Sequence, residues 1–211
     1  MNLKILIFIL LISQITLADA ISTVRVQPIT QEVVIGKQFT VELNVTPGVP
    51  IAGMQSNILF NPAYIRIDSI TFGNLFTQNG ASEFSNAGVI NNNTGTVVNI
   101  FSVILGPNNV NRDGTFIRVT GTALAKGTSG INLTNIKIAT PDGLSESLSY
   151  TNGTITVKYP PWDVNEDGIT NILDIQIVAS HFGETSPGGR WDVNGDGWVD
   201  VLDLVTTAGK I

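Results

Sequence analysis

The sequence predicts a mainly β protein that ends in a small helical module. Three observations indicate this: apolar residues that alternate with polar ones, turns rich in Gly, Asn and Pro, and an acidic repeat near the C-terminal end. The chain has 211 residues, which is enough for one or two ordinary domains. Its 21 glycines favour many tight turns, because glycine readily adopts positive φ.

Composition excludes several classes of function. The formal net charge is −6, whereas a nucleic-acid binder needs a basic surface. The chain contains no cysteine, so disulfides, thiolate metal sites and cysteine nucleophiles are ruled out. Its one histidine, His181, cannot form an imidazole-rich zinc site, and the chain has neither a phosphate-binding loop nor a nucleophile elbow. An enzyme is therefore the interpretation with least support.

The charge is concentrated at one end. Residues 163–211 carry nine acidic and two basic side chains, a net charge of −7, which leaves +1 for the rest of the chain. Such an asymmetry is typical of an interaction tail or a cation-binding segment.

Residues 1–20 have the pattern of a secretory signal peptide. Lys4 precedes an apolar run at residues 5–12, and residues 18–20 have the small-x-small form of a cleavage site. The run is shorter than the roughly 20 residues that span a bilayer. We expect a secreted, extracellular protein with no membrane span after cleavage; the alternative is an uncleaved membrane anchor.

Residues 21–158 have the pattern of a β domain. Phe39, Val41 and Leu43 alternate with polar neighbours, and comparable stretches recur as far as Val157. Turn-forming residues separate these stretches, and no sustained helical period occurs among them. Many short strands with such turns predict an antiparallel sandwich or barrel.

Several segments of this β domain resemble cohesin domains. They are, in chain order, residues 34–41, 50–55, 59–62, 114–119 and 151–157. The resemblance implies a jelly-roll-like β-sandwich of nine strands, a fold shared with some carbohydrate-binding modules. It also implies that a dockerin module is the partner.

In cohesins, two strands present outward side chains to the dockerin, and they correspond here to residues 51–60 and 97–104. Alternation along the first strand places Met54 and Ile58 toward the core. With Phe101 matched to a core aromatic residue, alternate neighbours on the second strand point outward. The partner-binding residues that this comparison implies are Gly53, Gln55, Asn57, Ile100, Ser102 and Ile104.

The acidic end contains an internal repeat. Residues 162–168 recur as residues 191–197, 29 positions later, and the segments that follow also match. In each copy, oxygen-bearing side chains occupy loop positions 1, 3, 5, 9 and 12, and glycine occupies position 6, which is the spacing of an EF-hand calcium loop. Position 7 contributes its backbone carbonyl and can be apolar. The predicted ligands of two Ca²⁺ ions are Asp163, Asn165, Asp167, Ile169, Asn171, Asp174, Asp192, Asn194, Asp196, Trp198, Asp200 and Asp203.

The repeat differs from an EF-hand in two respects. Asp174 and Asp203 replace the usual Glu at position 12, and two prolines at residues 160–161 disfavour a helix before the first loop. Both differences resemble the dockerin family, which implies a cohesin as partner. We expect helices at about residues 172–181 and 201–208, with His181 as a helix C-terminal cap. The small core is expected to contain Ile175, Val178, Phe182, Leu204 and Ile211.

Two further features concern partner choice and stability. In dockerins, positions 10 and 11 of each repeat select the partner and are often Ser-Thr; here they are Ile172, Leu173, Val201 and Leu202. Either the recognised surface is more apolar, or these side chains pack internally. A module this small has little apolar core and no disulfide, so we expect it to depend on calcium for folding.

The sequence therefore divides into a signal peptide at 1–20, a cohesin-like sandwich at 21–158, a Pro-rich linker at 159–162 and a dockerin-like module at 163–211. Together they predict a secreted, non-catalytic adaptor for calcium-dependent cohesin–dockerin assembly, linked to extracellular polysaccharide degradation. Expected partners are cohesin- or dockerin-bearing proteins. The chain itself is a further candidate partner, since it carries one module of each kind.

The alternative is a carbohydrate-binding module attached to a calcium-binding tail, with polysaccharide as the ligand. Aromatic platforms would favour it, yet all three tryptophans lie in or next to the tail. Tyr64 and Tyr150 are the only tyrosines before the linker. This scarcity favours protein binding.

Overall fold

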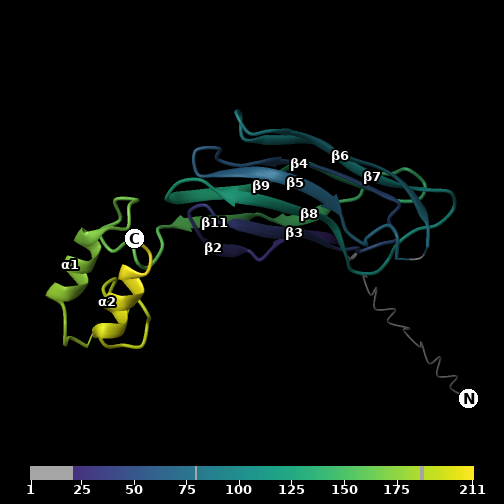
Figure 1. Ribbon diagram of the computed structural model, residues 1–211. Coiled ribbons are helices and arrows are strands. Elements are labelled where there is room, and N and C mark those ends of the chain that lie inside the picture. Colours follow the sequence, from purple (N-terminus) through teal and green to yellow (C-terminus); the bar gives the residue numbers. More distant parts are fainter. Residues whose placement is uncertain (1–20, 79, 186–187) are drawn as a thin grey trace, which may run out of the picture.

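The computed structural model describes residues 21–78, 80–185 and 188–211. Residues 1–20, where a signal peptide is predicted, lie outside this part of the chain. The described residues form a two-layered β-sandwich joined to a small helical tail (Figure 1). The predicted mainly β class with a helical C-terminal module is confirmed.

The sandwich consists of a five-stranded and a six-stranded sheet. The five-stranded sheet has the order β10-β1-β3-β8-β5, and the six-stranded sheet the order β2-β11-β9-β4-β7-β6. In chain order, the strands are β1 (Ser22–Gln27), β2 (Thr30–Val34), β3 (Gln38–Thr46), β4 (Gly53–Leu59), β5 (Ile65–Phe72), β6 (Ser82–Asn91), β7 (Thr96–Leu105), β8 (Gly114–Ala123), β9 (Gly127–Ala139), β10 (Leu148–Thr151) and β11 (Gly153–Lys158).

Near both ends of the β domain, the chain crosses from one sheet to the other after a short interruption. β1 and β2 are only two residues apart but belong to different sheets, and β10 and β11 are separated by Asn152 alone. These two interruptions explain why the described residues hold eleven strands where nine were expected. They also add two parallel pairs, β1 with β10 and β11 with β2, to an otherwise antiparallel sandwich.

Alternation places the core between the sheets. In β3, for example, Phe39, Val41 and Leu43 are buried while the residues between them are more exposed. Met54 and Ile58 of β4 point inward as predicted, and Gln55 and Asn57 point outward.

The prediction that Ile100, Ser102 and Ile104 point outward is wrong. These side chains of β7 are only 0%, 1% and 6% exposed. The reason is a β-bulge: Ser56 pairs with Ile100 and Ile58 with Val97, so that Val98 and Asn99 together face one residue of β4.

Asn99 makes this bulge geometrically feasible. Its φ is 64°, a left-handed conformation that asparagine tolerates better than most residues, and its N–H donates to Asn57 Oδ1 at 3.0 Å. Because the bulge adds one residue, Val97 and Ile100 both point inward and the alternation is reversed beyond Asn99. Phe101, Val103 and Leu105 therefore lie on the outer face.

The tail contains two short helices in the predicted places. They are α1 (Ile172–Ser180) and α2 (Val201–Ala208), and His181 caps the end of α1 as expected. Its ring stacks on Trp191, with ring centroids 3.9 Å apart.

The core of the tail differs in part from the prediction. Its buried residues are Val164, Val178, Val193 and Val199, three of which come from the loops. Partly buried side chains packed against them are Trp162, Ile177, Trp191 and Leu204. Phe182 and Ile211 are exposed, contrary to expectation, because the loop valines already fill the space between the two repeats.

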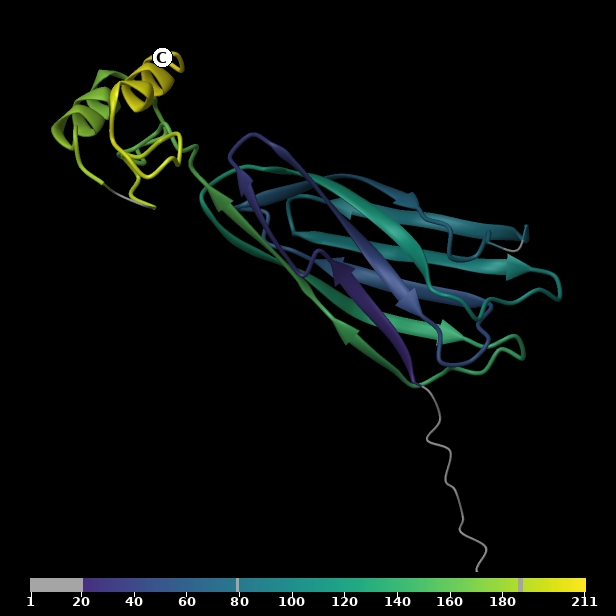
Figure 2. The same cartoon turned by 90° about the horizontal axis from the view of Figure 1, so that it is seen from below.

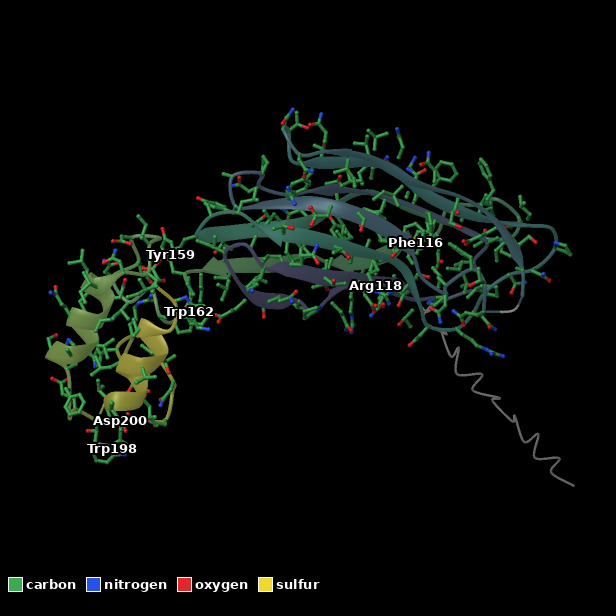
Figure 3. The ribbon with its side chains drawn as sticks, viewed as in Figure 1. Phe116, Arg118, Tyr159, Trp162, Trp198 and Asp200 are labelled. Carbon is green, nitrogen blue, oxygen red and sulfur yellow. The ribbon has the colours of Figure 1, made fainter. Side chains whose placement is uncertain are left out.

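The tail lies beyond one end of the sandwich, where β11 finishes (Figures 1 and 2). Tyr159 and Trp162 lie at the junction, and Trp198 and Asp200 lie at the far end of the tail (Figure 3). Lys210 connects the end of the tail to the linker, since its Nζ lies 4.6 Å from the centroid of the Trp162 ring.

Candidate calcium loops and docking surfaces

The two predicted calcium loops, loop 1 at residues 163–174 and loop 2 at residues 192–203, have nearly the same geometry. In loop 1, Asp163 Oδ2 accepts a hydrogen bond from Gly168 N, and Asn165 Oδ1 accepts one from Asp167 N, both at 2.9 Å. In loop 2, Asp192 Oδ2 and Asn194 Oδ1 accept the equivalent bonds, also at 2.9 Å. The side chains at positions 1 and 3 are thus fixed on the inner side of each loop.

The position-12 aspartates connect each helix to the start of its loop. Asp174 is fully buried, and its Oδ1 accepts from Val164 N at 2.8 Å and from Asn165 N at 3.1 Å. Its Oδ2 accepts from Asn171 N at 2.9 Å. Three backbone donors therefore stabilise one buried carboxylate, which would otherwise be costly to bury.

Asp203 makes the same set of contacts in the second repeat. It accepts from Val193 N at 2.8 Å, Asn194 N at 3.0 Å and Asp200 N at 2.9 Å. Asp200 in turn caps α2 by accepting from Leu202 N, as Asn171 caps α1 by accepting from Leu173 N. The residues at positions 9 and 12 thus begin each helix as well as belonging to the predicted ligand set.

One atom in loop 1 points to a cation. Asp163 Oδ1 is buried and has no hydrogen-bond partner. An unpaired buried carboxylate oxygen is strongly unfavourable unless a cation or donor neutralises it. Among the described residues, no three His, Cys, Asp or Glu side chains form a ready-made cluster. The loops instead combine carboxylates with amide and backbone oxygens, a mixture typical of Ca²⁺ sites.

Loop 1 is also attached to its surroundings by charged contacts. Glu166, at position 4, pairs with Lys126 in the turn between β8 and β9 and with Arg190 Nη1 at 2.8 Å. The hydrogen bond from Lys126 and the nearby Arg190 charge hold the pKa of Glu166 below its ordinary value. Lys126 Nζ also lies 5.5 Å from the centroid of the Tyr159 ring. Glu166 therefore connects loop 1 to the sandwich through Lys126 and to the segment before the second repeat through Arg190, and Lys126 in turn contacts the linker.

The positions of the tail that are predicted to select the partner are exposed. Ile172, Leu173, Val201 and Leu202 are between 50% and 59% exposed, so they do not pack internally. In Figures 1 and 2 the two helices run in opposite directions, so their N-terminal ends, with these exposed residues, lie at opposite ends of the helix pair. Val205, one turn further along α2, is also exposed. We name Val201, Leu202 and Val205 of α2 the tail patch.

The outer face of β4, β7 and β6 carries a second apolar area. Phe84, Val103 and Leu105 are 58%, 38% and 55% exposed, and Phe84 packs beside Phe101 with ring centroids 5.6 Å apart. Register places Phe84 opposite Val103. We name these four residues the sheet patch.

The predicted residues of β4 lie beside the sheet patch. Gln55 and Asn57 are partly exposed, whereas Gly53 is buried beneath Val103. A depression of about 340 Å³ adjoins this position and is lined in part by Gln55, Phe101 and Lys137. The sequence reasoning missed Phe84 and Leu105; the one available signal was the asparagine embedded in an apolar strand, which marks the bulge.

The structure is a two-layered sandwich joined to a pair of loop–helix repeats, and each part has an exposed apolar area. This combination is typical of proteins that bind other proteins. The chain matches the cohesin domain family over residues 24–157 and the type I dockerin domain over residues 161–208. It therefore belongs to the cohesin family and carries a type I dockerin domain after its cohesin domain. Both are non-catalytic interaction domains, and type I dockerins bind calcium. Proteins of this kind are typically extracellular.

Similar solved structures support the fold. A non-cellulosomal cohesin from the archaeon Archaeoglobus fulgidus is 18% identical with a TM-score of 0.51, covering 66% of this chain and 92% of that chain. A chain of a type I cohesin–dockerin complex from Clostridium thermocellum is 16% identical with a TM-score of 0.54, covering 67% and 96%. A chain from a complex of a cohesin and a dockerin of Acetivibrio cellulolyticus is 18% identical with a TM-score of 0.52, covering 65% and 99%.

Neither a curated relative nor a membrane-spanning helix was found. A search of curated protein sequences found no match. In the described part of the chain, no helix has the length and apolar character needed to cross a membrane.

Proposed function

We propose that this protein is a secreted, non-catalytic adaptor that joins proteins through calcium-dependent cohesin–dockerin contacts during extracellular polysaccharide degradation. The observation that carries the proposal is the presence of a cohesin and a type I dockerin domain on one chain, each with an exposed apolar surface. We assign residues 21–158 to the sandwich, 159–162 to the linker and 163–211 to the tail.

In this proposal the tail binds two Ca²⁺ ions, one in each loop. Loop 1 would bind its ion through Asp163, Asn165, Asp167, Ile169, Asn171 and Asp174, and loop 2 through Asp192, Asn194, Asp196, Trp198, Asp200 and Asp203. Bound calcium supplies positive charge, and two ions would change the net charge of the tail from −7 to −3.

Closure of the two loops also fixes the position of exposed side chains on the helices that follow them. Asp174 and Asp203 bind the backbone at the start of their loops, and each lies in the first turn of a helix whose N-terminal end presents exposed apolar side chains. Holding the loops closed therefore also fixes Ile172, Leu173, Val201 and Leu202 at the helix N-termini. Docking of these side chains requires an apolar partner surface.

The test is binding to purified modules. Cohesin and dockerin modules from the same source organism would be immobilised, and the full chain passed over them in millimolar calcium or in chelator. We expect the tail to bind a cohesin only with calcium, and the sandwich to bind a dockerin. Asp174→Asn together with Asp203→Asn should abolish the first contact and leave the second.

Glu184→Gln is the matched control, since it removes an acidic group from the tail outside the loops and should leave both contacts intact. Binding of the tail to a cohesin in chelator would contradict the calcium dependence. Failure to bind any cohesin or dockerin module in calcium would contradict the adaptor function.

A second candidate function is saccharide binding by the sandwich. A depression of about 310 Å³ is lined by Phe101 and by the amides of Gln55, Asn57, Asn86, Asn99 and Asn135. Amide groups both donate and accept hydrogen bonds, which suits the hydroxyl groups of sugars. Co-sedimentation with insoluble cellulose tests it: Asn86→Ala should reduce retention, and a wild-type chain that stays in solution would exclude cellulose as the ligand.

A further inference from the structure

The tail is held away from the sheet patch of its own chain. Two prolines at residues 160–161 stiffen the linker, and Glu166 pairs with Lys126 in the β8–β9 turn. In Figures 1 and 2 the tail lies beyond the end of the sandwich. The sheet patch consists of exposed and partly exposed side chains of β6 and β7, two strands of the six-stranded sheet. The two patches therefore cannot meet within one molecule without breaking these contacts.

The two patches match each other in chemical character. Phe84, Val103 and Leu105 present apolar groups on the sheet, and α2 presents Val201, Leu202 and Val205. Exposed apolar clusters of this kind in an otherwise polar surface mark protein contacts. One chain thus carries an apolar patch on each of two modules whose families bind each other.

The charges are also compatible with contact between the two patches. The tail has a net charge of −7, or −3 with two Ca²⁺ ions bound, and the rest of the chain has +1; exposed Lys137 lies at the edge of the depression beside Val103. Two tails would repel each other, whereas a tail and a sandwich would not. Contact between unlike modules is therefore favoured over contact between like modules.

We propose that the tail patch of one molecule docks on the sheet patch of a second copy of this chain. This inference rests on the proposed function and names its partner. Because the two surfaces differ, the contact is heterologous and leaves one free patch at each end of a pair. Association should therefore continue to chains or rings and should increase with concentration and with calcium.

Sedimentation velocity of the chain without residues 1–20 tests the inference. With calcium, the average sedimentation coefficient should rise with concentration, and chelator should return it to that of a monomer. Val103→Asp on the sheet patch or Leu202→Asp on the tail patch should each abolish association. Ile29→Asp is the matched control: it adds the same charge at a comparably exposed apolar site outside both patches and should associate like the wild type.

Mixing the two variants that do not associate alone tests whether the two patches bind each other. Val103→Asp keeps an intact tail patch and Leu202→Asp keeps an intact sheet patch, so the mixture should form pairs of one molecule of each and nothing larger. A mixture that stays monomeric, or single variants that still associate, would overturn the inference.

The outcome also separates this inference from the proposed function. If the wild type remains monomeric in calcium but binds a purified dockerin or cohesin module, then the partner is another protein and only the self-association is wrong. If it neither associates nor binds such modules, both proposals are wrong.

Discussion

The two predicted calcium loops share their fold but differ at position 4. In loop 2 this residue is Gly195, whose φ is 77° and whose N–H donates to Asp192 Oδ1 at 2.8 Å. In loop 1 it is Glu166, which adopts a φ of 59°, a conformation unfavourable for a residue with a Cβ atom. The equivalent oxygen, Asp163 Oδ1, has no partner.

Because of this difference, loop 1 makes contacts outside its own repeat. The side chain of Glu166 reaches Lys126 of the sandwich and Arg190 just before the second repeat, contacts that a glycine cannot make. Arg190 also donates to the backbone carbonyls of Asp163 and Val164. Loop 2 therefore has the hydrogen bond from the position-4 N–H to the position-1 carboxylate. Loop 1 lacks this bond, and its position-4 side chain instead connects the tail to the sandwich.

Removing calcium should have the largest effect, because it affects both loops together. All three tryptophans lie in or beside the tail, so tryptophan fluorescence reports on this module alone. We expect chelator to shift the emission to longer wavelength and to reduce the helical circular dichroism signal, while the β-sandwich still melts in its own transition. Identical spectra in chelator and in millimolar calcium would contradict calcium-dependent folding.

Loss of a position-12 carboxylate should have the next largest effect. Asp174→Ala leaves three backbone N–H groups without their acceptor, and each unsatisfied buried donor costs about 1–3 kcal/mol. We expect a loss of about 3 kcal/mol or more in the unfolding free energy of the calcium-loaded tail, measured by urea titration of tryptophan fluorescence. Asp203→Ala should cost the same, since its contacts match. A clearly smaller loss in one loop would show that the repeats are not energetically equivalent.

Exchanging the residues at position 4 should have opposite effects in the two loops. Glu166→Gly removes a positive φ from a residue with a Cβ and should stabilise loop 1 locally by about 1 kcal/mol. It should also release the tail from its fixed orientation, visible as a broader distance distribution in small-angle X-ray scattering. Gly195→Glu should destabilise loop 2 by about 1 kcal/mol and leave the orientation unchanged. An unchanged scattering profile for Glu166→Gly would show that this residue does not attach the modules.

Lys126→Ala should have the smallest effect on stability. It removes one exposed ion pair and a contact with the Tyr159 ring, which are worth about 1 kcal/mol or less together. The melting temperature of the sandwich should hardly change, but the scattering profile should broaden as it does for Glu166→Gly. Lys137→Ala removes an exposed lysine near the end of β9 that lies away from the β8–β9 turn; it is the control and should leave both measurements as in the wild type.

The sequence by itself determined the features that depend on local spacing. The ligand pattern of the loops follows from positions within a dozen residues, and the capping residues Asn171 and Asp200 set the helix starts where they were predicted. Alternation correctly predicted that Met54 and Ile58 of β4 point inward, because buried and more exposed residues alternate along this strand from Met54 to Leu59. The mainly β class followed from the same short-range periodicity.

Tertiary structure alone decided the features that depend on a distant partner. The bulge at Asn99 exists because β7 must fit the register of β4, and it reversed the orientation of Ile100, Ser102 and Ile104. A period of two assumes an uninterrupted strand, so one inserted residue changes the face of every residue after it. The meeting of Lys126 and Glu166, 40 residues apart, likewise depends on how the two modules pack, which local spacing does not encode.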